Sequence, residues 1–261
     1  MLLICFLPDD KFYSDMNTKK YETNILNGIE QAAISVISRA VKYDNEGKYP
    51  PALASYQEGI QLFLDVIKST SDKRKQELLR QKAAEYISRA EKIKEIVQQQ
   101  KDTGNYHEQI QIPNNGVGFS YESLFSKYLD KNVKRVEVED PYIRNVHQTY
   151  NFLSFCELLV RFCSELKKII LTTGSNQQDH VNQRSRFDSI RNSLSSYNVE
   201  LEIVYSDTLH DREIRLDNGW VIKVGRGLDI FKSVNKFSVG FTDQNLRPCH
   251  ETTVDIFFKQ H

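Results

Sequence analysis

The spacing of apolar residues divides the chain into a helical first part and a mixed second part. From about residue 27 to 101, apolar residues recur three and four positions apart, which is the period of a helix with one buried face. The first predicted helix covers roughly 27–45 and stops at Asn45-Glu46-Gly47. The second begins near Pro50-Pro51, because proline suits the first turn, and runs to about Lys68.

A third helix completes this pattern. Ser71-Asp72 can cap its start, and its apolar residues form a single seam. That seam comprises Leu79, Ala83, Tyr86, Ala90, Ile93 and Val97. Three helices with one apolar stripe each and short connections are expected to pack as an antiparallel all-α bundle, which we assign to residues 25–101.

Turn-forming residues mark a boundary after the bundle. Asp102-Thr103-Gly104-Asn105 and Pro113-Asn114-Asn115-Gly116 predict a linker over residues 102–118. Over residues 119–261, strand-like and helix-like stretches alternate. Strands are predicted at 133–140, 166–173 and 199–205, with helices at 147–162 and 185–197 between them. This rhythm predicts an α/β domain whose sheet has some parallel pairing.

A β-hairpin is predicted over residues 210–229. Ile214 and Leu216 alternate with charged residues, and Asn218-Gly219 is a strong signal for a two-residue turn, because both tolerate positive φ. Residues 237–241 and 252–258 are candidates for further strands or for a closing helix.

Composition narrows the range of functions. Lys+Arg and Asp+Glu both number 35 in 261 residues, so the net charge is near zero and argues against a nucleic-acid partner. The four cysteines and six histidines form no metal-ligand grouping, so neither a metal nor a cofactor is expected. Cys156 and Cys163 are expected to be buried thiols in a reducing cytosol. The apolar run Leu2 to Leu7 is too short to span a bilayer, and residues 1–24 are expected to be a disordered leader.

The hairpin also carries a chemical pattern. His210, Arg212 and Asp217 form an H-x-R-x4-D sequence, which resembles the H-x-K-x4-D signature of the phospholipase D superfamily. The resemblance implies a His that attacks phosphorus, a cation that holds phosphate oxygens and an Asp that orients the His. Alternation along a strand places positions 210 and 212 on one face, where both can meet one phosphate.

This sequence departs from the signature in two ways. Arg212 stands in place of Lys, and its planar fork is no substitute for a compact ammonium in a tight site. One near-match is present, whereas the family's active site needs two. We therefore assign no catalytic residue and expect a relic that binds phosphate. An active site shared across a dimer and a plain amphipathic hairpin are the alternatives.

The helical part resembles the MIT domain, the microtubule-interacting and transport module. The matching residues are Ala40-Val41-x-x-Asp44, Lys48-Tyr49-x-x-Ala52-x-x-x-Tyr56-x-x-Gly59-Ile60 and Tyr86 to Lys94. The resemblance implies that C-terminal helical tails of ESCRT-III subunits bind in a groove between the second and third helices. The residues expected to bind the tail are Leu62, Ala84, Ile87, Ser88, Glu91 and Glu95. MIT domains often carry Asp where Ser88 stands, which leaves the preferred tail open; for each residue the alternative is a solvated helix face.

Four blocks in the second part extend the resemblance. They are residues 118–125, 139–144, 210–215 and 247–257. With the MIT segment, they resemble a family in which an MIT domain precedes a phospholipase D-like domain. This implies a homodimer through the second domain, recruitment by ESCRT-III, binding to acidic phosphoinositide membranes and a role in cytokinetic abscission without phospholipase activity. The resemblance places the protein in the cytoplasm, peripherally on endosomal membranes and at the midbody.

Membrane binding requires a local basic cluster, because the second domain is not basic overall. Residues 25–101 carry 13 Lys and Arg against 10 Asp and Glu, a charge of +3, whereas residues 102–261 carry 19 against 21, a charge of −2. The candidate phospholipid-binding residues are Lys167, Lys168, Arg212, Arg215, Lys223 and Arg226, with Lys232 and Lys236 beyond them. A basic side chain near an anionic leaflet contributes about 1 kcal/mol. Internal ion pairs are the alternative for each residue.

Three functional hypotheses follow. The leading one is a non-enzymatic adaptor that joins ESCRT-III tails to membrane. The second is a phosphodiesterase whose active site is shared between two chains. The third is a regulatory adaptor that competes for the same tails and does not need lipid.

Overall fold

The computed structural model describes residues 10–259, with side chains from residue 25 onward. The chain forms two compact units, and the boundary lies between Gln100 and Lys101. The helical bundle was predicted to end at residue 101, one residue after this boundary. No helix in the part of the chain that the structure describes is long and apolar enough to cross a membrane.

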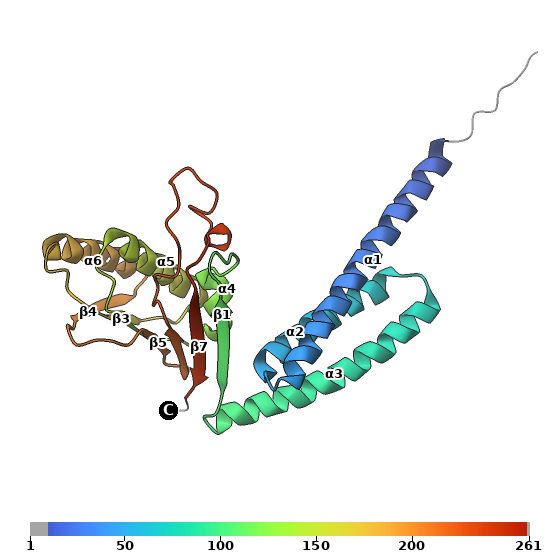
Figure 1. Cartoon of the computed structure of the whole chain (residues 1–261), viewed down its shortest axis with the longest axis horizontal. Coiled ribbons are helices and arrows are strands. Elements are labelled where there is room, and N and C mark those ends of the chain that lie inside the picture. Colours follow the sequence, from blue (N-terminus) through green and yellow to red (C-terminus); the bar gives the residue numbers. More distant parts are fainter. Residues whose placement is uncertain (1–9, 260–261) are drawn as a thin grey trace, which may run out of the picture. The chain divides into compact units, whose positions relative to one another are not determined.

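The first unit consists of three helices, labelled in Figure 1: α1 (Asp10–Asn45), α2 (Tyr49–Ser69) and α3 (Lys73–Asp102). The bundle is therefore confirmed, and Asp72 Oδ1 caps α3 by accepting hydrogen bonds from the backbone of Arg74 and Lys75 at 2.9 and 3.2 Å.

The start of α1 corrects the predicted disordered leader. Residues 10–24 are helical, whereas residues 1–9 lie outside the described part of the chain. The physical reason is that neither Pro nor Gly occurs between Pro8 and Gly28. Nothing in this polar stretch therefore stops the helix from extending toward the N-terminus.

Small residues bring α1 and α2 close together. Ala33 and Ala40 of α1 and Ala52 and Gly59 of α2 lie at buried positions. A Cβ atom on Gly59 would lie 2.6 Å from Cδ1 of Ile37, so glycine is what permits this approach. The third helix meets α2 through larger side chains, because the Tyr86 ring stacks on Phe63 at 6.2 Å between centroids.

An ion pair joins the C-terminal end of α1 to the middle of α3. Arg89 of α3 donates from Nε and Nη2 to the Asp44 carboxylate at 2.7 and 2.6 Å, and the Tyr56 hydroxyl donates to the same group at 3.2 Å. The Arg89 hydrogen bond holds the pKa of Asp44 below its usual value, and burial together with Asp44 raises the pKa of Tyr56 to about 12.

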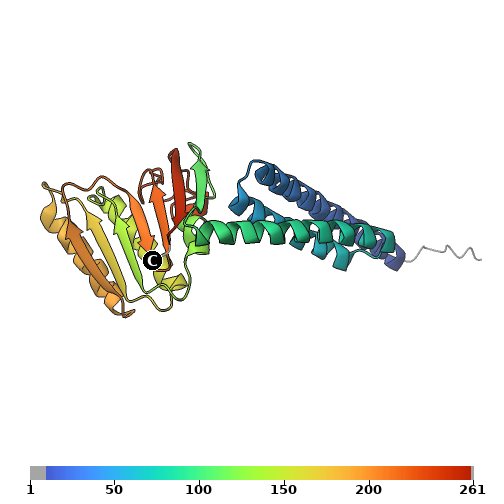
Figure 2. The ribbon, with the colours of Figure 1, turned by 90° about the horizontal axis from the view of Figure 1, so that it is seen from below.

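The second unit is built on a seven-stranded sheet with the order β1-β7-β6-β5-β2-β3-β4 (Figure 2). The strands are β1 (His107–Ile112), β2 (Arg135–Glu139), β3 (Lys168–Thr173), β4 (Glu200–Tyr205), β5 (Glu213–Leu216), β6 (Trp220–Val224) and β7 (Thr252–Phe258). β2, β3 and β4 are parallel, and the remaining pairs are antiparallel. The predicted α/β class with partial parallel pairing is confirmed.

Two predictions in this unit are wrong. β1 lies inside the predicted linker, where it pairs with β7 along the sheet edge. Its Gln-Ile-Gln-Ile alternation is a strand signal, but adjacent turn residues obscured it. Residues 237–241 form turns and bends within a long loop and no strand.

Helices cover one face of the sheet. α5 (Val146–Phe162) and α6 (His180–Ser195) connect the parallel strands and lie on one side of them (Figures 1 and 2). The short α4 (Tyr121–Phe125) continues into η1 (Ser126–Tyr128), and η2 (Gln244–Leu246) precedes β7. Buried Val136, Ile169 and Leu201 face these helices from neighbouring positions of the register. Apolar burial on this face holds the layers together.

Candidate functional site

The predicted tail-binding residues of α3 form one exposed stripe. Ala84, Ile87, Ser88, Glu91 and Glu95 are all exposed, and their spacing of three and four places them along one side of the helix. The stripe borders the buried seam without belonging to it. The structure therefore brings these predicted residues together.

Leu62, the predicted partner on α2, lies on the other side of that helix. It follows Ser55 and Glu58 at spacings of seven and four, so the three share a stripe. Arg39 of α1 contacts that stripe, because it donates to Ser55 Oγ at 3.3 Å and to Glu58 Oε2 at 2.7 Å. Leu62 thus faces the α1 side and is not a groove residue.

Leu64 takes the place that was predicted for Leu62. Phe63 and Tyr86 meet across α2 and α3, and Leu64 and Ile87 are the next residues on each helix. Because the helices are antiparallel, one step beyond each ring turns both side chains to the same side, away from α1. Both are exposed apolar residues. The missed signal is that Leu64 follows Ile60 and precedes Ile67 at helical spacing.

The H-x-R-x4-D residues do not assemble into a catalytic cluster. His210 and Arg212 precede β5, whereas Asp217 follows it, so Arg212 and Asp217 are roughly 16 Å apart along an extended chain. Asp217 accepts hydrogen bonds from the backbone N–H groups of Lys134 and Arg135 at 3.0 to 3.1 Å. It therefore fastens the hairpin to the start of β2 and does not orient His210.

Arg212 also makes contacts within the protein. Its Nη1 donates to the Gly225 carbonyl, and its guanidinium lies 4.3 Å from the centre of the Tyr142 ring. Arg144 lies 5.7 Å from the same ring. Arg212 Nε is buried without a hydrogen-bond partner. These contacts make Arg212 a stacked structural residue.

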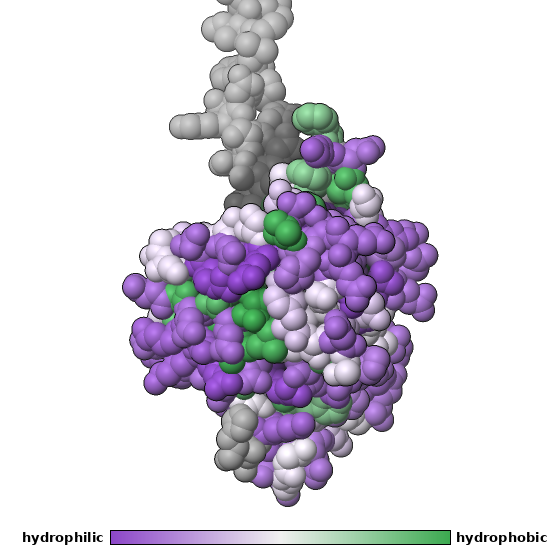
Figure 3. Space-filling model, turned by 90° about the vertical axis from the view of Figure 1, so that its left-hand side faces the viewer, coloured by the Kyte–Doolittle hydropathy of each residue, from purple (hydrophilic) through white to green (hydrophobic). Residues whose placement is uncertain are grey.

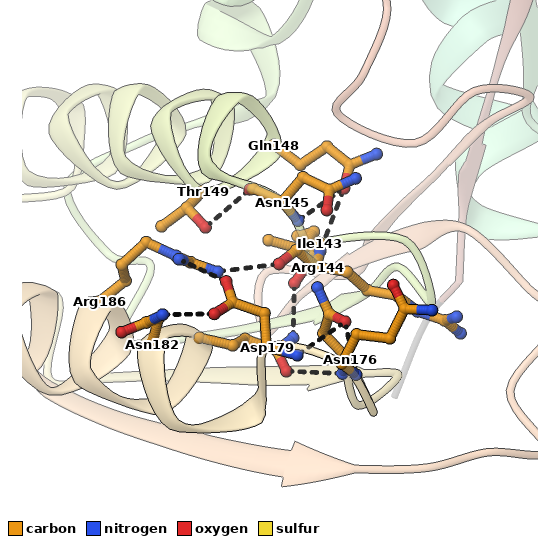
Figure 4. A network of polar contacts seen from close by, with 11 residues as sticks. Ile143, Arg144, Asn145, Gln148, Thr149, Asn176, Asp179, Asn182 and Arg186 are labelled. Carbon is orange, nitrogen blue, oxygen red and sulfur yellow. Dashed lines mark hydrogen bonds and ion pairs between the residues drawn. The ribbon is translucent and has the colours of Figure 1, made fainter.

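Polar residues near the carboxyl ends of β2 and β3 serve the adjoining loops (Figure 4). Arg186 donates to the Asp179 carboxylate at 3.1 Å and to the Arg144 carbonyl at 3.0 Å. The fully buried Gln183 donates to the Ile143 and Gly174 carbonyls at 2.9 and 3.1 Å. Because these donors go to backbone carbonyls and to Asp179, the network positions the loops.

Three predicted lipid-binding residues lie on the charged face of the sheet, opposite α5 and α6. Lys168 pairs with Glu200 and Glu202 at 3.1 and 2.7 Å. Arg215 pairs with Glu139 at 2.9 Å and also with Glu213, and Lys223 lies 3.4 Å from Glu213. The strands place Glu137, Glu139, Glu200, Glu202, Glu213 and Asp255 on this face against Arg135, Lys168, Arg215 and Lys223.

With six carboxylates and four cations, the charged face has a net charge of −2, which disfavours contact with an anionic leaflet. Figure 3, seen from the end where β4 and α6 lie, shows a mostly hydrophilic surface with a smaller hydrophobic patch near its centre. The prediction of a basic cluster around Lys168, Arg215 and Lys223 is therefore wrong, because cross-strand glutamates neutralise them.

The other two predicted lipid-binding cations lie elsewhere. Lys167 is exposed at the start of β3 and has no side-chain partner among the described residues. Arg226 is exposed after β6, where its Nε donates to the Asp229 carbonyl at 3.1 Å. No group of three or more His, Cys, Asp or Glu side chains in the described residues could hold a metal ion.

Both units match known domain families. Residues 30–95 match the model of the MIT (microtubule interacting and transport) domain, and residues 118–258 match that of the phospholipase D-like domain at the C-terminus of MIT. The chain is 51% identical over 232 residues to MIT domain-containing protein 1 of Mus musculus, covering 88% of this chain and 93% of that protein.

Shorter similarities also occur. The chain is 32% identical over 73 residues to serine/threonine-protein kinase ULK3 of Xenopus laevis, covering 28% of this chain and 16% of the kinase. It is 34% identical over 61 residues to sorting nexin-15 of Bos taurus, covering 23% and 18% of the two chains. The matches over both units show that the chain belongs to the family in which an MIT domain is followed by a C-terminal phospholipase D-like domain.

Proposed function

We propose that the chain is a non-enzymatic adaptor. Its MIT domain binds C-terminal helical tails of ESCRT-III subunits, and its phospholipase D-like domain binds acidic phospholipid membranes, including phosphoinositides. It acts as a homodimer through the second domain in cytokinetic abscission, in the cytoplasm, on endosomal membranes and at the midbody.

The observation that carries the tail-binding proposal is the exposed apolar surface beside the contact between α2 and α3. Leu64 and Ile87 supply this surface, one from each helix, and Glu91 and Glu95 continue along α3. An amphipathic helix recognises such a surface by inserting apolar side chains, while a basic residue meets the carboxylates. Ser88 contributes no charge, so Glu91 becomes the nearest acidic partner.

The absence of an assembled motif supports the non-enzymatic part of the proposal. A phosphodiesterase of this class needs a nucleophile, a cation and an orienting acid at one phosphorus. Here the strand β5 separates His210 from Asp217, and Arg212 stacks on Tyr142.

A titration of the full chain against ESCRT-III tail peptides tests the proposal. We expect saturable binding of roughly micromolar affinity, about −8 kcal/mol, that Ile87→Asp abolishes. Leu78→Asp is the matched control, because Leu78 is another exposed apolar residue of α3 and lies away from the stripe. Loss of binding in Leu78→Asp alone would place the tail on the opposite side of α3, and no binding to any tail would remove the proposal.

Vesicle binding separates this adaptor from one that acts by competition alone. Both bind tails, but only the proposed function requires the full chain to bind vesicles that contain acidic phospholipid. Tail binding without vesicle binding would favour the purely competitive adaptor.

A further inference from the structure

A long loop of the second unit is held in shape by its own hydrogen bonds. We call this loop, residues 232–248, the arm. Its base is closed by the bridge between Phe231 and Cys249 and by the Lys232 N–H, which donates to the Pro248 carbonyl at 2.9 Å. Figure 1 shows it as the red loop that extends beyond the sheet and helices of this unit.

Arg247 fixes the shape of the arm from within. Its Nε donates to the Gly240 carbonyl at 2.7 Å, and its Nη2 donates to the Phe241 carbonyl. Its guanidinium also lies 5.6 Å from the centre of the Phe231 ring and 5.9 Å from that of Phe241. The arm is thus ordered before it meets a partner, which lowers the conformational entropy lost on binding.

The tip of the arm presents apolar side chains to solvent. Phe237 is 103% exposed and Val239 is 80% exposed, and no other large apolar side chain in residues 25–259 exceeds Phe237. Two turns close the tip, because Ser238 N–H donates to Asn235 O at 3.0 Å and Phe241 N–H donates to Ser238 O at 3.2 Å. These turns satisfy backbone groups that would be costly to leave unpaired in an apolar environment.

The arm carries a net positive charge, although Lys232 and Arg247 lie at its base, where Lys232 Nζ donates to Asn115 Oδ1 at 2.7 Å. The arm contains Lys232, Lys236 and Arg247 against Asp243, a net charge of +2. Lys236 precedes Phe237 directly. By contrast, the charged face of the sheet has a net charge of −2. The arm therefore combines the exposed apolar residues and the cations that an anionic lipid interface attracts.

We propose that the arm tip inserts into the surface of acidic phospholipid bilayers. Phe237 and Val239 enter the boundary between headgroups and acyl chains, and Lys236 contacts lipid phosphates. The inference rests on the proposed membrane function and assigns it to a part of the domain outside the degenerate motif.

Sedimentation of the full chain with vesicles tests the arm. Phosphatidylcholine vesicles with and without phosphatidylserine are the probes, and the variants are Phe237→Ser and Val239→Ser. Val181→Ser is the matched control, because Val181 of α6 is also 80% exposed and lies outside the arm. We expect each arm variant to lower partitioning onto the acidic vesicles about tenfold, equal to about 1.4 kcal/mol, and the control to leave it unchanged.

Fluorescence reports insertion directly. In Phe237→Trp, the new indole is expected to shift to the blue on acidic vesicles and to be quenched by brominated acyl chains. The wild-type chain is the control, since its single tryptophan, Trp220, is only 9% exposed. The proposal is overturned if Phe237→Trp binds the vesicles but the emission of the new indole is neither shifted nor quenched.

The remaining outcomes are also decisive. If the wild-type chain binds no vesicle, the membrane part of the proposed function fails and the inference fails with it. If it binds but the arm variants bind equally well, only the inference fails. If Phe237→Ser instead converts a dimer to a monomer in analytical ultracentrifugation without changing vesicle binding, the tip contacts a second copy of the chain, and insertion is excluded.

Discussion

At the scale of single residues, the two glycines in the helices of the MIT domain provide a matched comparison. Gly28 of α1 has nothing within 4 Å of the position a Cβ would take, whereas at Gly59 of α2 that atom would lie 2.6 Å from Ile37 Cδ1. We expect Gly28→Ala to raise the free energy of unfolding by roughly 0.5–1 kcal/mol through helix propensity. Gly59→Ala should lower it by about 1–3 kcal/mol through overpacking. Chemical denaturation measures both free energies of unfolding. If Gly59→Ala raised stability as much as Gly28→Ala, this would show that α1 can move away from α2.

Asp44 gives the MIT domain a pH dependence. Its pKa is lowered chiefly by the Arg89 hydrogen bond, so its contribution to stability is present above its ordinary pKa of 3.8 and is lost as pH falls through the lower folded-state value. We expect Asp44→Asn to cost about 1–2 kcal/mol at neutral pH and much less in acid. Denaturant unfolding of both proteins across this range measures the difference. If the cost of Asp44→Asn is the same in acid as at neutral pH, the lost stability comes from packing and not from the ion pair.

At the scale of elements, the ends of β5 distinguish a structural motif from a catalytic one. Asp217→Ala removes the acceptor for the Lys134 and Arg135 backbone groups, so it should cost about 1–3 kcal/mol of unfolding free energy. His210→Ala changes an exposed residue and should stay within about 0.5 kcal/mol. Neither the wild-type chain nor His210→Ala should hydrolyse a chromogenic phosphodiester. Turnover that His210→Ala abolishes would revive an active site shared between two chains.

Helices and strands could be predicted from the sequence where apolar residues recur at one regular spacing. The helices follow from apolar residues three and four apart, and the parallel strands follow from compact apolar runs such as that around Ile169. β1 was missed because turn residues flank its short alternating stretch, and its partner, β7, lies more than a hundred residues away in the sequence.

The candidate site was predictable in part for a similar reason. A single helix reveals which residues share a stripe, so the α3 residues from Ala84 to Glu95 were found together. It does not reveal which neighbour packs on which side. The choice between Leu62 and Leu64 depends on the Arg39 and Tyr86 contacts, which join different helices. The ion pairs of Lys168 and Arg215 likewise depend on strand order.

At the scale of the whole molecule, an adaptor gains strength by engaging two surfaces at once. In the proposed function, tail binding beside α2 and α3 makes the second event, lipid contact, intramolecular on a membrane that displays both ligands. Such coupling exceeds either single affinity by roughly 10²–10⁴ without any new contact, provided that both sites can be reached together.

Vesicles that carry acidic phospholipid and anchored ESCRT-III tail peptide test this coupling. We expect the full chain to bind them roughly a hundredfold more tightly than vesicles with either ligand alone. Ile87→Asp should reduce binding to the level of lipid alone, and Phe237→Ser combined with Val239→Ser to that of tail alone, because each removes one of two independent attachments. The combined variant with all three changes should not bind. Affinities that merely add, with no gain on the doubly decorated vesicles, would mean that the two domains cannot engage one membrane together.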